Sequence, residues 1–499
     1  MYSQICSASV YGVDGRLIYV ETDIANGLPQ VNIVGLPDSA VRESIERVRA
    51  AIKNSGFKFP MQRITVNLAP ADLRKAGAAF DLAIALGILQ ASGQITASRF
   101  AATLVIGELA LNGEVRPVPG VLAMVEQAML SGRTKALLPY DNAEEAALLQ
   151  AMDVLAISHL KQLAAPENEW EQLRFTGRKR DSAGGDEHDY GDFADVTGQH
   201  HVKRALLIAA AGQHPVLLSG PPGTGKTMLA RRLPGIMPRL TEQEALQVTK
   251  VYSSSGQLLD KPASLMQARP FRAPHHSITT AALIGGGRVP RAGEATLAHR
   301  GVLFLDELPE FSARTLESLR QPLEEKSVTI ARANAVFHFP ANFLLLAAMN
   351  PCPCGFLHHE TPARRCTCSD SQIAKYRSKL SGPLIDRFDM TLDVPRPDLS
   401  AQSSSSLCTA EMRQIVQKAR QSMPVYSPLL SGSALDQAVK LSKEGATMLL
   451  AAIDALGISM RARDRIVKLA RTIATIEQSS AVEPSHIAEA ISYRSFDRS

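Results

Sequence analysis

The chain has 499 residues, of which 45% are hydrophobic and 21% charged, and its formal net charge is +5, so the composition is that of a globular protein and excludes a disordered or strongly basic chain. We expect no signal peptide, because the first residues lack both a charged n-region and a long apolar h-region. We also expect no membrane span, because the apolar run at 80–89 carries an Asp and is too short to cross a bilayer. Six cysteines are too few for a secreted disulfide scaffold and favour a cytoplasmic protein. At roughly 100–200 residues per domain, the length predicts three domains and allows two or four.

The first predicted domain spans residues 1–170 and mixes strand and helix patterns. The β-branched runs at 31–35 (VNIVG) and 64–70 (ITVNLAP) predict strands, and 104–118 predicts a hairpin with Asn-Gly in its turn. Residues 38–56 predict a helix that begins at an Asp cap, carries apolar residues at helical spacing and ends at a Gly. This pattern predicts an α+β domain.

A second domain of the α/β class is predicted at 193–395, after a linker at 171–192 that is rich in Gly, Ser and charges of both signs. Apolar runs at 214–220, 301–307 and 343–350 each end in polar residues and are separated by helical patterns. Such runs predict a parallel sheet that is buried on both faces.

The third predicted domain, 396–499, is all helical after a Ser-rich loop at 395–406. The stretch 467–477 (VKLARTIATIE) is typical, with its apolar residues on one face. The long interval between the first two core strands predicts a basic insertion at about 250–298.

Residues 220–227 (GPPGTGKT) match the phosphate-binding pattern G-x-x-x-x-G-K-[ST] between a predicted strand and a helix. Backbone N–H groups and the helix N-terminus would hold phosphate oxygens. Lys226 would contact the β- and γ-phosphates, and Thr227 would ligate Mg²⁺. A Gly/Pro turn with an accidental Lys is the alternative. The predicted ATP-binding residues are Gly220, Pro221, Pro222, Gly223, Thr224, Gly225, Lys226 and Thr227.

Polar residues follow the next two predicted strands. Asp306 would hold Mg²⁺, and Glu307 would polarise the attacking water, although an acidic pair at a strand end is often only a helix cap. Asn350 would position water near the γ-phosphate, or it begins a turn before Pro351.

Two arginines are candidates for contact with the nucleotide from a distance. Arg387 would reach the nucleotide of a neighbouring subunit as an arginine finger, or it forms a surface salt bridge with Asp386 or Asp389. Arg461 lies in the helical end and would contact the γ-phosphate from that side.

Four cysteines form a C-x-C-x₁₁-C-x-C pattern in a predicted loop at 350–370. Four thiolates suit tetrahedral Zn²⁺ and leave no open coordination position, so we predict a structural site. Four free thiols are the alternative, and His358 or His359 would substitute for a cysteine that faces away. The predicted ligands are Cys352, Cys354, Cys366 and Cys368.

Taken together, these motifs resemble the YifB/ComM family of magnesium-chelatase-like AAA+ ATPases, and the likeness covers nearly the whole chain. It implies an N-terminal Lon-protease-like domain of the ribosomal S5 domain 2 type, a P-loop AAA+ core and an all-α lid. It further implies that Asp306 and Glu307 are the Walker B pair, Asn350 sensor 1, Arg387 the finger and Arg461 sensor 2. The stretches that carry it are 220–227, 301–311, 347–355, 381–389, 271–279 and 64–77.

The resemblance also implies a function. Members include a competence-linked DNA branch-migration helicase, so we expect a cytoplasmic homo-hexamer that hydrolyses ATP and acts on single-stranded and branched DNA. The expected process is recombination of incoming DNA during natural transformation, with recombination proteins as partners. Two other functions stay open: a magnesium-chelatase-type ATPase that drives metal insertion through a partner, and an AAA+ unfoldase.

Clusters of basic residues are the candidate DNA contacts, since such clusters neutralise phosphates without reading sequence. Surface arginines in contact with water are the alternative. One cluster lies in the insertion, one on a predicted hairpin at 326–339 and one beside the cysteines. They are Arg269, Arg272, His275, His276, Arg288 and Arg291; Lys326 and Arg332; and Arg364, Arg365, Lys375, Arg377 and Lys379.

The N-terminal domain is expected to be noncatalytic. A Lon-type protease needs a Ser nucleophile and a Lys base, and the corresponding positions hold Ala78 or Ala79 and, at about this position, Leu122. The domain would bind DNA or assist ring assembly, with Arg63, Arg74 and Lys75 as weak candidates for DNA contact.

Overall fold

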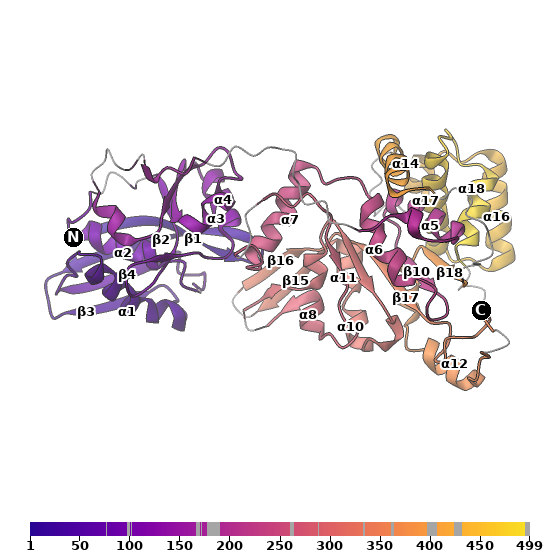
Figure 1. The fold of residues 1–499 in the computed structure, drawn as a ribbon, viewed down its shortest axis with the longest axis horizontal. Helices are drawn as coiled ribbons and strands as arrows, with labels where there is room; N and C mark the ends of the chain where they lie inside the picture. Colours follow the sequence, from indigo (N-terminus) through magenta and orange to yellow (C-terminus); the bar gives the residue numbers. More distant parts are fainter. Residues whose placement is uncertain are drawn as a thin grey trace.

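A computed structural model gives an elongated molecule in which an N-terminal domain, a central sheet and a set of C-terminal helices follow one another along the long axis (Figure 1). No helix in the described part of the chain is both long and apolar enough to cross a membrane. The structure describes residues 1–75, 77–96, 100, 102–165, 170, 172–176, 190–259, 264–287, 289–332, 335–360, 364–396, 407–423 and 432–494.

A mixed sheet is the centre of the N-terminal domain. Its described strands run in the order β3-β4-β2-β1-β5-β8-β9, in which β2 is antiparallel to its neighbours β1 and β4 and the remaining neighbours are parallel. The predicted strands at 31–35 and 64–70 are confirmed as β3 and β4. The strands are β1 (Tyr2–Tyr11), β2 (Asp14–Ala25), β3 (Gln30–Val34), β4 (Arg63–Ala69), β5 (Thr103–Val105), β8 (Lys135–Pro139) and β9 (Asp153–Ile157).

Helices cover this sheet as the sequence patterns predict. The Asp38 side chain accepts a hydrogen bond from Val41 N at 2.9 Å and caps α1. The apolar run at 80–89 forms most of α2, which is buried at every position except Gln90. The predicted hairpin is present as two short paired strands with Asn112-Gly113 between them. The elements are α1 (Ser39–Asn54), α2 (Asp81–Ala91), β6 (Glu108–Leu109), β7 (Val115–Arg116), α3 (Val121–Leu130) and α4 (Ala143–Ala146).

The central sheet is fully parallel, in the order β11-β14-β17-β10-β18, which confirms the predicted α/β core. All residues of β10, β14 and β17 are buried. Because these three strands are neighbours, the polar residues that follow them meet at one edge. The strands are β10 (Val216–Ser219), β11 (Phe271–Arg272), β14 (Val302–Leu305), β17 (Leu344–Met349) and β18 (Met390–Asp393), with α5 (His200–Gly212) before β10 and α6 (Lys226–Ile236) after it.

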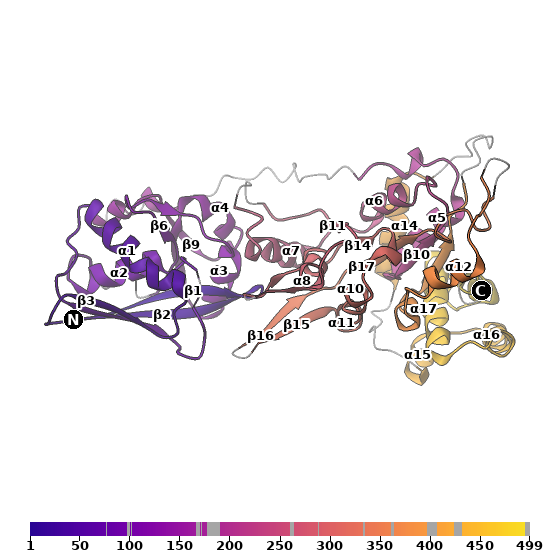
Figure 2. The same ribbon diagram turned by 90° about the horizontal axis from the view of Figure 1, so that it is seen from below.

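The expected insertion lies between α6 and β14, and the predicted hairpin at 326–339 is confirmed by the pairing of Ser327 with Pro340. Figure 2 shows the hairpin alongside the N-terminal domain. The elements are α7 (Glu242–Ser254), α8 (Thr280–Ile284), β12 (Gly285–Gly286), β13 (Arg291–Ala292), α9 (Glu294–Leu297), α10 (Ala313–Glu317), α11 (Arg320–Glu325), β15 (Ser327–Arg332) and β16 (Ala335–Pro340).

The chain after β18 is helical, and α17 packs against α5, α14 and α18. The predicted linker residues 177–189 and loop residues 397–406 lie outside the described residues. The predicted domain bounds stay a prediction. The remaining helices are α12 (Asp370–Arg377), α13 (Gly382–Ile385), α14 (Thr409–Ser422), α15 (Gly432–Ala438), α16 (Lys443–Leu456), α17 (Met460–Ile476) and α18 (Pro484–Ser492).

The N-terminal domain docks on the core through the turn between β1 and β2. Val13 in this turn is only 4% exposed and belongs to the same apolar cluster as Val251 of α7 and Phe339 of β16. Beside it, Lys250 Nζ lies 2.9 Å from an Asp14 oxygen and 2.8 Å from a Glu126 oxygen. The two parts are therefore joined by both apolar packing and ion pairs.

Candidate nucleotide and metal sites

The segment 220–227 connects β10 to α6 at the carboxyl edge of the central sheet. Gly223 and Gly225 have φ angles of +81° and +85°, which L side chains rarely adopt. A Cβ at Gly220 would lie 2.3 Å from the carbonyl oxygen of Val394. These glycines allow the tight loop, and α6 begins at Lys226, so its free N–H groups face the same space.

Lys226 lies at the centre of this loop and is 8% exposed. Its Nζ donates to the carbonyl oxygens of Gly220 at 2.6 Å and Pro221 at 3.0 Å, and it lies 3.4 Å from Asn350 Oδ1. Burial lowers the pKa of Lys226, and the Asp306 and Asp393 carboxylates oppose that shift. The predicted phosphate lysine and the predicted sensor asparagine are thus in contact.

Thr227 and Asp306 come together from different elements. Thr227 Oγ1, in the first turn of α6, donates to Asp306 Oδ2 at 2.8 Å, and the other Asp306 oxygen accepts from the N–H of Glu307 at 2.9 Å. A hydroxyl and a carboxylate at this distance are hard oxygen ligands of the kind that Mg²⁺ prefers. The donor set therefore fits the predicted Mg²⁺ site.

Glu307 contacts a residue that the sequence analysis assigned to DNA. Its Oε2 lies 3.2 Å from His276 Nδ1, and the ring centroids of His275 and His276 are 4.1 Å apart. His276 follows β11, which pairs with β14, so the sheet brings it to Glu307. His276 lies in the stretch 271–279, which contributes to the family resemblance, but nothing in the sequence indicated that it contacts Glu307.

The two candidate arginines have different environments. Arg387 donates to Pro383 O at 2.7 Å and pairs with Glu324 of α11, and in the described part of the chain it forms no ion pair with Asp386 or Asp389. Arg461 is exposed in the first turn of α17 and has no ion pair or hydrogen-bond partner in the described part of the chain. In a single chain neither arginine is held against the phosphate loop.

Asp389 is a buried residue whose importance the sequence analysis missed. His214 Nδ1 lies 2.8 Å from its Oδ2, and Arg465 Nε lies 3.6 Å from its Oδ1. Burial opposes ionisation, but these basic partners hold the pKa of Asp389 below its ordinary value. The other ring nitrogen of His214 contacts Thr472 at 2.8 Å, so this group ties the start of β10 to α17.

The four predicted cysteine ligands form one cluster. Their sulfur atoms all lie within 4.8 Å of one another, with Cys352 to Cys354 at 3.3 Å. Burial opposes ionisation of Cys354, but hydrogen bonds to the backbone and to neighbouring thiols lower its pKa to about 6. His359 lies instead against Asp393 at 2.9 Å, and His358 is exposed, so neither histidine joins the cluster. The donor set fits a tetrahedral Zn²⁺ site.

Several of the predicted DNA contacts have partners inside the protein in this structure, so their contact with DNA stays a prediction. Arg269 is 4% exposed, pairs with Glu244 at 3.3 Å and donates to backbone carbonyls. Arg272 pairs with Glu294 through both carboxylate oxygens, at 2.6 and 2.8 Å. Lys75 is 0% exposed. Arg288 lies outside the described residues.

Other predicted DNA contacts are exposed on the surface. Arg291 lies on β13 and Arg332 at the end of β15, where it donates to Gly287 O at 2.9 Å. Beside the cysteines, the exposed cations include Arg364, Arg365, Lys375 and Lys379, the last of which lies 3.3 Å from Glu310.

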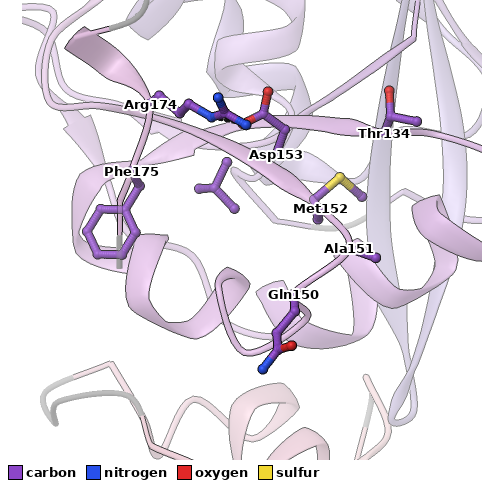
Figure 3. A pocket seen from close by; sticks show the side chains of 8 residues that line it. Thr134, Gln150, Ala151, Met152, Asp153, Arg174 and Phe175 are labelled. Atoms are coloured by element: carbon purple, nitrogen blue, oxygen red, sulfur yellow. Dashed lines mark hydrogen bonds and ion pairs between the residues drawn. The ribbon is translucent and has the colours of Figure 1, made fainter. Parts of the chain in front are cut away.

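The N-terminal domain carries a shallow hollow away from all of these residues. It lies beside the start of β9, and the ion pair of Arg174 Nε and Asp153 Oδ1 at 2.7 Å closes one side (Figure 3). The positions of the absent protease pair do not line it: Ala79 precedes α2, and Leu122 is fully buried in α3.

Known protein families match nearly the whole chain. Residues 192–402 match the family described as magnesium chelatase, subunit ChlI, residues 20–142 match subunit ChlI of Mg-chelatase, and 404–494 match its C-terminal part. The chain is 41% identical to a YifB protein of Escherichia coli and 42% identical to the competence protein ComM of Haemophilus influenzae, in each case over 99% of this chain and 97% of the relative. Lon protease 2 of Bacillus subtilis is 28% identical over 31% of this chain and 30% of its own length.

Proposed function

The chain belongs to the YifB/ComM family of magnesium-chelatase-like AAA+ ATPases, and on that premise we propose that it is a hexameric motor that uses ATP hydrolysis to move DNA strands. The proposed task is branch migration during recombination of incoming DNA in natural transformation, in the cytoplasm.

One observation carries the ATPase part of this proposal. Residues from three neighbouring strand ends converge: Lys226 contacts Asn350 at 3.4 Å, and Thr227 contacts Asp306 at 2.8 Å. In the proposed roles Lys226 and the loop N–H groups bind the phosphates, Thr227 and Asp306 hold Mg²⁺, and Glu307 takes the proton of the attacking water. ATP and Mg²⁺ supply the phosphoryl-transfer chemistry when bound.

The DNA part is supported less directly. One relative is a competence protein, and competence is the capacity of a bacterium to take up DNA. Exposed cations lie on β13, at the end of β15 and beside the cysteines, where they would neutralise phosphates of single-stranded or branched DNA without sequence preference. Recombination proteins are the proposed partners of the ring.

The cysteine cluster is proposed to hold Zn²⁺ in a structural role. Four sulfur ligands within 4.8 Å of one another support it. Elemental analysis of purified protein tests it, and a Cys352→Ser, Cys354→Ser variant that keeps full metal content would contradict it.

The function is tested by ATPase rates without DNA, with single-stranded DNA and with a four-way junction. We expect stimulation by DNA, with the junction also unwound in a strand-displacement assay. Lys226→Ala is the control and is expected to lose hydrolysis while it stays folded by circular dichroism.

An ATPase rate that no DNA changes would contradict the DNA motor. The match to magnesium chelatase subunits would then favour an ATPase that drives metal insertion through a partner protein. An unfoldase would instead be stimulated by unfolded protein.

A further inference from the structure

We propose that the metal held by the cysteine cluster positions the phosphate loop, so that metal binding and nucleotide binding strengthen each other. This inference rests on the proposed Zn²⁺ and ATP sites. We call residues 351–360 and 364–368 the cysteine loop. The structure brings this loop against the nucleotide site at three places.

The first place is the phosphate loop itself. Gly355 is buried, and a Cβ at this position would lie 2.7 Å from Cδ of Pro222. The backbone of the cysteine loop therefore lies directly on the phosphate loop. Gly355 also has a φ of +87°, so glycine is favoured here for both conformation and space.

The second place is the predicted sensor. Asn350 directly follows β17, and Cys352, two residues further on, is fully buried. The side chain of Asn350 lies 3.4 Å from Lys226 Nζ. A ligand that fixes the Cys352 thiol would therefore also restrain the backbone that carries Asn350.

The third place is the end of β18. His359 Nε2 lies 2.9 Å from Asp393 Oδ1, and Asp393 is the register partner of Ser219, the residue before the phosphate loop. The guanidinium groups of Arg364 and Arg396 each lie 5.6 Å from the centroid of the Phe356 ring. The loop thus touches both strands that flank the start of the phosphate loop.

The cysteine loop has little apolar burial of its own to keep it in this position. Of its described residues, only Pro351, Cys352 and Gly355 are buried. Structural Zn²⁺ sites contribute folding free energy directly, so a metal that joins the two cysteine pairs would supply the missing order. Without the metal, the cysteine loop would no longer be held against Pro222 and Asn350. Part of the free energy of ATP binding would then be used to order these residues, so ATP would bind more weakly.

Linkage makes this proposal testable in two directions. If metal strengthens nucleotide binding by some factor, nucleotide must strengthen metal binding by the same factor. Typical couplings between sites are about 5- to 150-fold.

The experiment uses the full chain as purified. Zn²⁺ release to a chromogenic chelator is followed with and without a non-hydrolysable ATP analogue and Mg²⁺. The dissociation constant of a fluorescent ATP analogue is measured before and after Zn²⁺ removal. We expect the analogue to slow Zn²⁺ release several-fold, and Zn²⁺ removal to weaken nucleotide binding several-fold.

Gly355→Ala changes the contact between the cysteine loop and the phosphate loop without removing a cysteine ligand. It keeps all four cysteines but adds a methyl group against Pro222, so we expect Zn²⁺ to stay bound while nucleotide binding weakens and the effect of nucleotide on Zn²⁺ release shrinks. Gly132→Ala is the control: its φ is +78°, so the backbone strain is similar, but nothing lies within 4 Å of the added Cβ.

Each contrary result has a distinct meaning. Zn²⁺ release that is the same with and without nucleotide, together with unchanged nucleotide affinity after Zn²⁺ removal, overturns the coupling and leaves both proposed sites standing. Protein purified without Zn²⁺ overturns the metal site and the coupling with it. Metal-loaded protein that does not bind nucleotide overturns the proposed ATPase itself.

Discussion

Arg387 has one partner inside its own chain and another proposed in a neighbouring subunit. It pairs with Glu324, and its side chain is only 12% exposed. A finger residue acts on the nucleotide of the next subunit, so ring assembly would have to exchange the Glu324 contact for the phosphate. The sequence pattern around Arg387 gave no sign of this partner, which lies 63 positions away.

Arg387→Ala is expected to lower the ATPase rate by on the order of 10³-fold, since arginine fingers supply rate increases of that size. Nucleotide binding by single chains should change little. Rings mixed from Arg387→Ala and Lys226→Ala chains should recover part of the rate, because some interfaces then combine an intact finger with an intact phosphate loop. Mixed rings with no recovery would contradict action between subunits.

His299 is a buried histidine outside the nucleotide site with a direct effect on stability. It is 5% exposed, and its Nδ1 accepts the N–H of Asn342 at 3.1 Å. Burial, with a smaller effect of Arg300, lowers the pKa of His299 to about 4. The folded state therefore favours neutral His299, and the stability that this provides is present above the unfolded pKa near 6.5 and is lost as the pH falls toward 4.

Lowering the pH from about 7.5 to about 5 should lower the free energy of unfolding by about 2 kcal/mol through His299, because the unfolded chain takes up a proton there while the folded state keeps the ring mostly neutral. His299→Gln keeps an acceptor for the Asn342 N–H but cannot be protonated. Urea unfolding at both pH values should therefore show a smaller loss of unfolding free energy at the lower pH for the variant than for wild type. Equal losses of unfolding free energy in the two proteins would mean that folding does not disfavour the protonated form of His299.

At the scale of elements, local signals decided where α1 begins. Asp38 has extended backbone geometry, and its side chain accepts from Val41 N in the first turn. The buried face of α1 then follows the predicted apolar spacing, including Val41, Ile45, Val48 and Ile52. Cap and periodicity act over a few residues, so this helix is predictable from sequence.

Asp38→Ala should destabilise α1 by about 1 kcal/mol, the usual cost of losing an N-cap oxygen. Amide hydrogen exchange in the first turn of α1 should speed up, with no change in α2. Asp38→Asn keeps an acceptor oxygen and should restore most of the protection. Exchange that is equal in the Ala and Asn variants would show that the cap hydrogen bond contributes little.

At the scale of the molecule, the turn of the β1–β2 hairpin joins the N-terminal domain to the AAA+ core. Val13 enters the apolar cluster of α7 and β16, and the Tyr11 and Phe337 rings stack with centroids 6.0 Å apart. The β15–β16 hairpin, a proposed DNA contact, is therefore packed against the N-terminal domain. The N-terminal domain, which we predict to be noncatalytic, is therefore in direct contact with the hairpin that we propose to bind DNA.

Val13→Asp would bury a carboxylate in this cluster and should separate the two parts, since an unpaired buried charge is costly. Hydrogen exchange should rise in α7 and β16 while the N-terminal sheet stays protected. Leu28→Asp is the control, because Leu28 is 88% exposed in the same domain. Unchanged exchange at α7 in the Val13 variant would contradict tight docking.

The sequence by itself determined the family, the α/β class and most of the elements, because these depend on contiguous patterns. The glycine-rich loop before Lys226, the buried run of β14 and the cap at Asp38 are each set within about ten residues. Strand ends were also predictable as places for polar residues, so Asp306 and Asn350 were expected near the phosphate loop. Their catalytic roles stay predictions.

Only the tertiary structure decided the partners of individual charged side chains. Arg269 and Arg291 belong to the same basic cluster in the sequence, yet Arg269 is buried against Glu244 while Arg291 is exposed. His276 faces Glu307 because β11 and β14 are sheet neighbours, although many residues separate them in sequence. The free energy of a charge depends on burial and on the nearest opposite charge, and folding sets both through contacts between distant segments.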